Sequence, residues 1–355
     1  MGKILSSKSL WLFLIFLALS GISYALDYGL QLIVSLFFLG LVVVVKGADF
    51  LVEGASSIAR QLGVSSLIIG LTIVAFGTSL PEFTVSLVAA IGGFRDISVG
   101  NIVGSNIANI GLVLGLTGLV ASIAVHKSVV KFEAPYMIAG SALLVLLSIG
   151  TPDFAGRPFL LGRIDGAILL LVFMMFMTYI LHSVRKERSA AQEGILAVVG
   201  EGSKSRARNA IMVLAGLAGT IIGAKLLVDN GAAMARSFGV SEAFIGLTLV
   251  AVGTSIPELV TSVVAAIKKL PDIAVGNIIG SNIFNALFIL GVAAIVAPLE
   301  VSPGIVFSDM LVMLGFAVAL QLLMLNGKIN RWNGLVLLGS YMAYIAYLSL
   351  TSIPL

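Results

Sequence analysis

Long apolar runs, separated by short polar segments, follow one another along almost the whole chain. A run of about 20 apolar residues is long enough to cross a bilayer as a helix. The pattern predicts an all-α polytopic membrane protein. Its ten predicted transmembrane helices cover residues 29–46, 64–92, 97–121, 134–150, 164–182, 210–228, 240–267, 272–298, 304–325 and 333–352, after a shorter apolar run at 10–26.

Two of the apolar regions are copies of each other. Gly70–Gly115 and Gly246–Gly291 align without a gap, and 28 of 46 positions are identical, so chance does not explain the match. Both copies keep GTSxPE followed by GNIxGSNIxN. Passing from the second predicted span to the seventh crosses the membrane an odd number of times, so the copies run in opposite directions. This predicts two inverted five-helix repeats, an arrangement typical of transporters.

The repeats divide the chain into four predicted regions. The first five-helix repeat covers 29–182 with its motif at 70–115, and the second covers 209–355 with its motif at 246–291. Residues 183–208 form a short cytoplasmic linker. Residues 1–28 carry Lys3 and Lys8, a short apolar stretch and small residues at the end. This layout suits a cleaved signal peptide and an uncleaved signal-anchor helix alike.

Composition and charge agree with a membrane protein. The chain is 59% hydrophobic and 11% charged, whereas a soluble domain has about 25% charged residues. Alternation of the predicted spans places sixteen of the 21 lysines and arginines on the cytoplasmic side, which satisfies the positive-inside rule. The basic excess therefore predicts orientation in the bilayer and implies no nucleic-acid partner. The absence of cysteine excludes thiol chemistry, and the short loops are typical of a multi-pass protein of a prokaryotic cell membrane.

Each motif places a lone glutamate, Glu82 or Glu258, deep within an apolar span. A carboxylate near the bilayer centre costs at least about 2.5–3.5 kcal/mol on insertion scales. No lysine or arginine lies deep enough in a predicted span to pair with either residue. A structural ion pair and a permanently protonated glutamate are the alternatives, but two carboxylates beside helix-breaking Pro81 and Pro257 favour a cation site.

Neutral oxygen donors accompany both glutamates. Helical spacing places the hydroxyls that precede each glutamate on its side of the helix, and the partner segments carry polar side chains at four-residue steps. Carboxylate, hydroxyl and amide oxygens suit Ca²⁺ or Na⁺ rather than a soft transition metal. These donors are Thr78, Ser79, Asn101, Ser105 and Asn109, with Thr254, Ser255, Asn277, Ser281 and Asn285 in the second copy. For Asn101, Asn106, Asn277 and Asn282, hydrogen bonding between helices is the alternative role.

GTSLPE with GSNIAN, and GTSIPE with GSNIFN, resemble the two alpha repeats of prokaryotic sodium/calcium exchangers, within the cation/calcium antiporter superfamily. The resemblance implies that Na⁺ and Ca²⁺ compete for one cluster between the second, third, seventh and eighth helices. It also implies that the first and sixth helices slide as the gate. The implied metal ligands are Glu82, Glu258, Thr78, Ser79, Thr254, Ser255, Ser105, Asn109, Ser281, Asn285 and the carbonyls of Ala75 and Ala251.

The expected function is secondary active exchange of Na⁺ for Ca²⁺ by alternating access. Potassium-dependent relatives typically carry aspartate at the position of Asn285, and here both symmetric positions are asparagine, which predicts exchange without K⁺. An H⁺/Ca²⁺ or other cation/Ca²⁺ antiporter is the alternative, followed by a passive Ca²⁺ channel. The chain lacks HExxH and GxSxG motifs, so no enzyme is expected. Na⁺, Ca²⁺ and the lipid bilayer are the expected partners, with no cofactor and no obligate protein partner.

Overall fold

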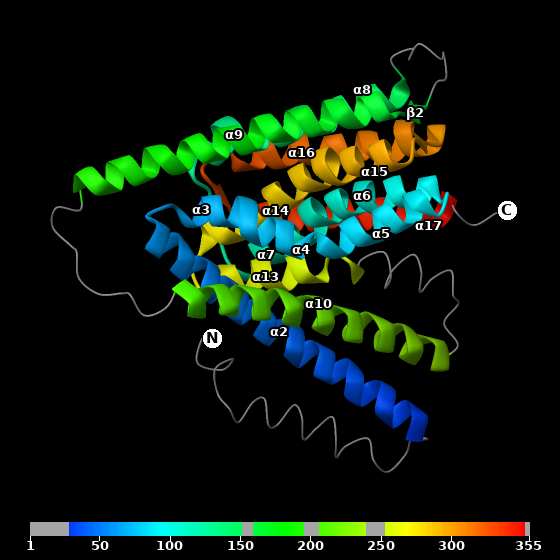
Figure 1. Ribbon diagram of the computed structural model, residues 1–355. Helices are drawn as coiled ribbons and strands as arrows, with labels where there is room; N and C mark the ends of the chain where they lie inside the picture. Colours follow the sequence, from blue (N-terminus) through cyan, green and yellow to red (C-terminus); the bar gives the residue numbers. More distant parts are fainter. Residues whose placement is uncertain (1–27, 151–158, 195–205, 239–252, 352–355) are drawn as a thin grey trace.

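The computed structural model describes residues 28–150, 159–194, 206–238 and 253–351 (Figure 1). Almost all of these residues are helical. The segment predicted as a signal peptide or signal anchor, residues 1–28, lies outside the described residues except for its last residue.

The elements of the first half begin with a long helix and end with another. In chain order they are α2 (Tyr28–Leu62), α3 (Ser66–Ile69), π-helical η1 (Gly70–Val74), α4 (Ala75–Thr78), α5 (Leu80–Ile91), α6 (Arg95–Ala108), π-helical η2 (Asn109–Leu114), α7 (Gly115–Val120), β1 (Ile123–Ala124), π-helical η3 (Val129–Glu133), α8 (Ala134–Ile149), β2 (Leu160–Leu161) and α9 (Arg163–Gly194).

The second half repeats this order closely. Its described elements are α10 (Arg206–Ser237), α13 (Ile256–Ile267), α14 (Pro271–Ile283), π-helical η5 (Phe284–Ile289), α15 (Leu290–Val296), β3 (Leu299–Glu300), π-helical η6 (Ile305–Met310), α16 (Leu311–Met324), β4 (Lys328–Ile329) and α17 (Arg331–Thr351). Two short antiparallel sheets, β1·β4 and β2·β3, each join one strand from either half.

The predicted membrane helices are confirmed, but the count of ten is not. Among the described residues, eight helices are long and apolar enough to cross a bilayer. A ninth span consists of Ser66–Thr78 and Leu80–Ile91, which meet at an angle of 47°. Ile256–Ile267 is the apolar end of the span expected at 240–267, and the preceding residues 239–252 lie outside the described part of the chain.

The long helices extend further than the hydrophobic pattern indicated. The span expected at 29–46 continues as α2 to Leu62, and the span expected at 210–228 is α10, Arg206–Ser237. The α9 helix likewise runs beyond 182 to Gly194, into the segment predicted as linker. Charged residues such as Lys46 and Asp49 mark the end of an apolar run but do not break a helix, because their side chains can remain partly exposed while the backbone stays hydrogen-bonded. Accordingly, both of these side chains are partly exposed.

Helices α2 and α10 pack against each other along their length, at one side of the molecule (Figure 1). They run antiparallel, because Gly40 lies beside Leu227 and Gly54 beside Asn209. A Cβ atom added at Gly47 would overlap the backbone nitrogen of Thr220. Glycines at the contact let the two backbones approach closely, which is a common packing device of membrane helices.

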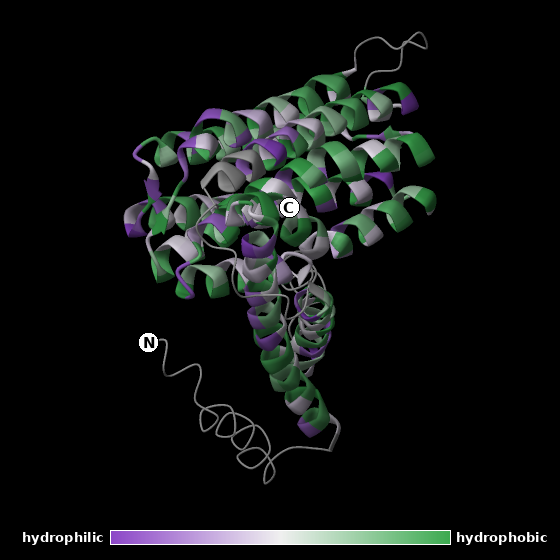
Figure 2. Cartoon of the chain, turned by 60° about the vertical axis from the view of Figure 1, so that its left-hand side comes forward, coloured by the Kyte–Doolittle hydropathy of each residue, from purple (hydrophilic) through white to green (hydrophobic). Residues whose placement is uncertain are grey.

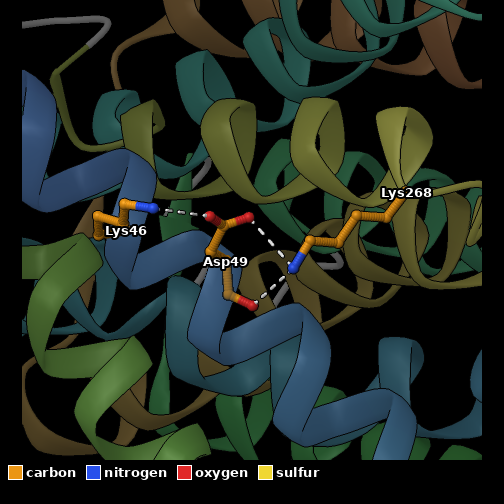
Figure 3. Close-up of polar contacts among 3 residues, drawn as sticks. All are labelled: Lys46, Asp49 and Lys268. Carbon is orange, nitrogen blue, oxygen red and sulfur yellow. Dashed lines mark hydrogen bonds and ion pairs between the residues drawn. The ribbon is translucent and has the colours of Figure 1, made fainter. Parts of the chain in front are cut away.

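An ionic contact connects α2 with the end of α13 (Figure 3). The Lys268 Nζ atom donates to the Asp49 carbonyl oxygen at 3.1 Å and pairs with Asp49 Oδ1 at 3.1 Å. Lys46 Nζ lies 3.7 Å from the other carboxylate oxygen. The repeat-equivalent positions of Lys268 and Asp49 are Gly92 and Lys225, which cannot form this ion pair. The contact therefore joins the first half to the second and has no counterpart at the repeat-equivalent positions.

The motif helices lie at the centre of the bundle. In the most apolar window of Arg95–Val120, 78% is buried inside the protein, and the value for Pro271–Val296 is 83%. The corresponding value for both Gly29–Leu62 and Arg331–Leu350 is 17%, so those helices are peripheral. Hydrophobic positions predominate along the helices, while many hydrophilic positions lie at helix ends (Figure 2). The polar motif residues are thus held inside an apolar bundle.

Candidate ion-binding site

Both GTSxPE motifs depart from regular helical geometry shortly before the glutamate. Ser79 has φ −84° and ψ 6°, and Ser255 has φ −88° and ψ 4°, and a new helix, α5 or α13, begins directly after each serine. Pro81 and Pro257 follow at the opening of α5 and α13, where a proline's missing N–H is not needed. Glu82 and Glu258 consequently lie in the first turn of their helices, where the helix dipole favours negative charge.

The two glutamates are fully buried, each with 0% exposure. Their carboxylates lie close enough to interact electrostatically. Both oxygens of Glu82, and Oε2 of Glu258, have no hydrogen-bond partner among the described residues. A buried carboxylate without a partner is costly, and two such groups side by side are costlier still. A bound cation would remove this cost.

Hydroxyl groups from both repeats surround the carboxylates. Ser79 Oγ, in the first repeat, donates to Glu258 Oε1 at 3.2 Å. Thr78 and Ser281 also lie beside Glu258. Around Glu82, Thr254 of the second repeat lies beside Ser105, with 3.5 Å between their hydroxyl oxygens. Each carboxylate therefore faces hydroxyls of the opposite repeat, and the site is shared between the two halves.

Backbone carbonyls near the helix breaks add further oxygens. The Ala75 carbonyl accepts hydrogen bonds from Thr78 Oγ1 and from Ser281 Oγ, both at 3.4 Å. These long contacts place the carbonyl among the site hydroxyls. Its repeat equivalent, Ala251, lies outside the described residues. Ser255 is described and buried, and its hydroxyl has no partner among the described residues.

Asn101 and Asn277 each form hydrogen bonds between the helix that carries the glutamate and the helix that follows it. Asn101 Nδ2 donates to Ser86 Oγ at 2.9 Å and to the Glu82 carbonyl at 3.2 Å. Asn277 Nδ2 makes the equivalent bonds to Ser262 Oγ at 3.1 Å and to the Glu258 carbonyl at 3.5 Å. Their amides bond between helices, the alternative role that the sequence left open. Ser86 and Ser262 were not singled out from the sequence, although both repeats carry serine at this position.

Four further asparagines cross-connect the repeats. Asn109 Nδ2 donates to Asn282 Oδ1 at 3.1 Å, and Asn285 Nδ2 donates to Asn106 Oδ1 at 3.0 Å. Since each bond is the repeat image of the other, the network follows the internal symmetry. The Oδ1 atoms of Asn109 and Asn285 are buried without a hydrogen-bond partner in the described structure. These two oxygens are therefore available to a cation.

The site combines two carboxylates with neutral oxygens. Within the described residues, no group of three or more His, Cys, Asp or Glu side chains could hold a metal ion. All the formal charge of the site comes from Glu82 and Glu258, and the surrounding hydroxyl, amide and carbonyl oxygens are hard donors. This donor set fits Ca²⁺, or Na⁺ ions of equivalent total charge, and fits soft transition metals poorly.

Comparison with known proteins gives one consistent picture. A family model described as sodium/calcium exchanger protein matches residues 32–182 and 208–350. The inner membrane protein YrbG of Escherichia coli K12 is 38% identical over 322 residues, which cover 88% of this chain and 96% of YrbG. The sodium/calcium exchanger MaX1 of Methanosarcina acetivorans is 33% identical over 341 residues, covering 88% and 97% of the two chains.

The fold is similar to that of a solved exchanger. The structure of the sodium-calcium exchanger NCX_Mj, soaked with zero Na⁺ and Ca²⁺, superposes with a TM-score of 0.75 at 34% sequence identity. The match covers 89% of this chain and 99% of NCX_Mj. Both the arrangement of helices and the sequence are therefore shared over nearly the full length.

Proposed function

Because the chain belongs to the sodium/calcium exchanger family, and is thus a multi-pass membrane cation/Ca²⁺ antiporter rather than an enzyme, we propose that it exchanges Na⁺ for Ca²⁺ without K⁺ and by alternating access. We expect Na⁺ and Ca²⁺ to be its transported ions, with no cofactor and no obligate protein partner.

One observation carries the proposal. Glu82 and Glu258 come from opposite repeats, are fully buried, and present three carboxylate oxygens without a hydrogen-bond partner in the described structure. Their combined charge of −2 balances one Ca²⁺ or two Na⁺. Because a single pair of carboxylates serves both loads, binding of one load excludes the other, and this exclusion couples the two fluxes.

The proposed ligands are those that the resemblance implied. Besides the two glutamates, eight side chains of the set either adjoin the carboxylates in the geometry described above or carry a buried oxygen without a hydrogen-bond partner in the described structure. The full proposed set is Glu82, Glu258, Thr78, Ser79, Thr254, Ser255, Ser105, Asn109, Ser281 and Asn285, with the carbonyls of Ala75 and Ala251.

Independence from K⁺ is proposed on the charge of the site. Asn109 and Asn285 contribute neutral amide oxygens. A carboxylate at either position would raise the site charge to −3 and favour a further monovalent cation. With a charge of −2, one Ca²⁺ already neutralises the carboxylates.

Alternating access is proposed from the internal symmetry and from the packing of α2 and α10. The two five-helix repeats, 29–182 and 209–355, enclose the site between them, which is the usual place for a transported ion. The α2–α10 pair contacts the rest of the bundle at α3, η1, α4 and α13, including through Lys268. Close glycine contacts between α2 and α10 hold the two helices together, so the pair would move as one unit past the site helices.

Uptake of ⁴⁵Ca²⁺ by sodium-loaded proteoliposomes tests the function. Vesicles are diluted at clamped voltage into Na⁺-free buffer that contains either K⁺ or an impermeant organic cation. The proposal expects uptake that requires internal Na⁺ and has the same rate in both buffers. Uptake indifferent to internal Na⁺ would point to proton coupling or a channel, and uptake only with K⁺ would refute K⁺ independence.

A further inference from the structure

Five phenylalanine rings form a cluster next to the proposed ion site. They belong to α4, α5, α9 and η5, and none of them is a proposed ion ligand. Neighbouring ring centroids lie 4.9 to 6.4 Å apart, within the range in which aromatic pairs attract each other. The phenylalanine cluster consists of Phe76, Phe83, Phe173, Phe284 and Phe288.

Phe288 contacts both arms of the broken second span. Phe76 lies in α4, before the 47° bend, and Phe83 lies in α5, after it. Seven residues make about two helical turns, which places both side chains on one face of the span. The Phe288 centroid is 6.4 Å from that of Phe76 and 5.9 Å from that of Phe83. One ring of the second repeat therefore bridges the bend in the first.

Two buried rings pack against Phe288. Its centroid lies 5.2 Å from that of Phe173 on α9 and 6.0 Å from that of Phe284 in η5. Phe173 and Phe284 themselves meet edge to face at 4.9 Å, and each is only 6% exposed. Phe284 also contacts Phe76, with 5.5 Å between the centroids. The bridging ring is thus packed against the buried part of the bundle.

The two bridged arms carry different ion ligands. Phe76 directly follows Ala75, whose carbonyl is a proposed ligand, and Phe83 directly follows Glu82. Successive residues of a helix point about 100° apart, so the rings can pack against one another while the Glu82 carboxylate faces the site. The Ala75 carbonyl and the Glu82 carboxylate lie on opposite sides of the bend. A change in the bend angle would therefore change the distance between these two oxygen donors.

The cluster does not follow the internal repeat. Four of its rings fall in the duplicated segments, and none of the four has an aromatic residue at the equivalent position. Those equivalent residues are Val252, Leu259, Ala108 and Leu112. A shared ion site explains why the ligands are repeated, whereas the rings need an explanation that applies to the first bend alone.

We propose that Phe288 is a positioning residue for Ca²⁺ binding. Its ring fixes the 47° bend, and so holds the Ala75 carbonyl and the Glu82 carboxylate at the spacing that one cation needs. A phenylalanine ring offers no oxygen, so Phe288 acts through the ligands and is not one of them. The inference rests on the proposed function for the identity of the ion, whereas the role of the ring in the bend does not depend on it.

Distances between spin labels test the role of Phe288 in the bend. Because the chain has no cysteine, Ser66→Cys with Ile91→Cys directs labels only to the two ends of the broken span. Double electron–electron resonance is measured on the purified protein without Ca²⁺ or Na⁺. Phe288→Ala should broaden or shift the distance distribution. Phe307→Ala, which removes a ring outside the cluster that pairs with Phe159 at 5.7 Å, should leave the distribution unchanged.

Equilibrium binding of ⁴⁵Ca²⁺ tests the effect on the ligands. Phe288→Ala and Phe288→Leu should each raise the Ca²⁺ dissociation constant about tenfold, because small displacements of positioned groups are costly. Phe288→Tyr keeps the ring and should keep the affinity of the unaltered chain, as should Phe307→Ala. If Phe288 only filled space, Phe288→Leu would bind Ca²⁺ as tightly as Phe288→Tyr, and that result would overturn the proposal.

The two measurements separate failure of this inference from failure of the proposed function. If the unaltered chain binds Ca²⁺ and Phe288→Ala changes neither the affinity nor the label distances, Phe288 has no positioning role. If the unaltered chain binds no Ca²⁺, the proposed function fails, and the label distances alone decide whether the ring fixes the bend.

Discussion

At the scale of single residues, the unpartnered carboxylate oxygens of Glu82 and Glu258 govern the behaviour of the site. Neither side chain is exposed, and no basic side chain pairs with them in the described structure. A cation is the partner that the geometry fits. Any change that removes one charge leaves the other carboxylate as the sole counter-charge of a divalent ion.

Glu82→Gln and Glu258→Gln should each abolish calcium transport. Loss of one member of a buried charge pair costs about 2 kcal/mol or more, which corresponds to at least about thirty-fold in Ca²⁺ affinity. Sodium-driven ⁴⁵Ca²⁺ uptake in proteoliposomes is the measurement. Glu53→Gln, an exposed glutamate on α2, is the matched control and should transport normally. Normal uptake by either variant would contradict the proposed role of the glutamate that it replaces.

Ser79→Ala should weaken calcium binding while the protein stays folded. The variant removes the hydrogen bond from Ser79 Oγ to Glu258 Oε1. Hydrogen bonds to charged groups are worth about 1.5–3 kcal/mol, so the Ca²⁺ concentration for half-maximal uptake should rise about tenfold or more. Thr84→Ala is the control, because the Thr84 hydroxyl bonds only to the Leu80 carbonyl of its own helix. An unchanged Ca²⁺ dependence for Ser79→Ala would contradict this role.

The sequence predicted most of these residues because both copies of the motif repeat them. Repetition singled out the glutamates, hydroxyls and asparagines, but it did not say which asparagines bond to protein and which offer an oxygen. Asn106 and Asn109 lie in the same motif, and their amides cross to Asn285 and Asn282 on the other repeat. Contacts between segments far apart in sequence depend on how the helices pack. The periodicity of apolar residues does not determine that packing.

At the scale of elements, the contact between α2 and α10 depends on glycine. The backbones meet at several glycines, and an added methyl group has no room at Gly47. The hydrophobic pattern predicted two spans here but ended both early, because it records where apolar residues stop and not where the helix stops. The broken second span, with its 47° bend, was in contrast foreseeable from Pro81.

Gly47→Ala should destabilise the protein by about 1–3 kcal/mol, the usual cost of overpacking. The reason is overlap of the new methyl group with the backbone of α10 at Thr220. The thermal unfolding midpoint in detergent measures the effect. Gly315→Ala is the control, since Gly315 is exposed on α16 and no atom of the described structure lies within 4 Å of its added Cβ. Equal midpoints for the two variants would refute a tight α2–α10 contact.

Two acid–tyrosine contacts at equivalent helix starts were not predicted. Glu133 Oε1 accepts a hydrogen bond from Tyr179 at 3.0 Å, and Asp309 Oδ1 accepts one from Tyr344 at 2.9 Å. The acids occupy equivalent positions in η3 and η6, so the repeat could have revealed them. The tyrosines do not, because α9 and α17 follow at different distances along the chain. Each contact joins a span to the next one in its own half.

At the scale of the whole molecule, the two halves depend on each other. The proposed ion site takes residues from both, the two small sheets each pair one strand from either half, and the asparagine network crosses between them. Inverted repeats were predictable from the duplicated motif and the number of spans. A site between the two halves was expected from the inverted repeats, and the hydrogen bond from Ser79 to Glu258 now gives its sharing a geometric basis.

Bound ions should stabilise the whole molecule, because the site exists only when the halves are assembled. A ligand at 100 times its dissociation constant adds about 2.7 kcal/mol to the free energy of unfolding. Ca²⁺ and Na⁺ should each raise the thermal unfolding midpoint of the purified protein, and chelation of Ca²⁺ in Na⁺-free buffer should lower it. K⁺ should not replace either ion. Glu258→Gln should show no increase with Ca²⁺, and a full increase in that variant would contradict a shared site.

Equilibrium binding of ⁴⁵Ca²⁺ to the purified protein, titrated with Na⁺, tests most directly whether one pair of carboxylates serves both ions. The account predicts one high-affinity Ca²⁺ per chain, full displacement by Na⁺ with a steeper than first-order dependence, and loss of binding in Glu82→Gln. Calcium that stays bound at saturating Na⁺, or that binds equally well to the Glu82→Gln variant, would contradict it.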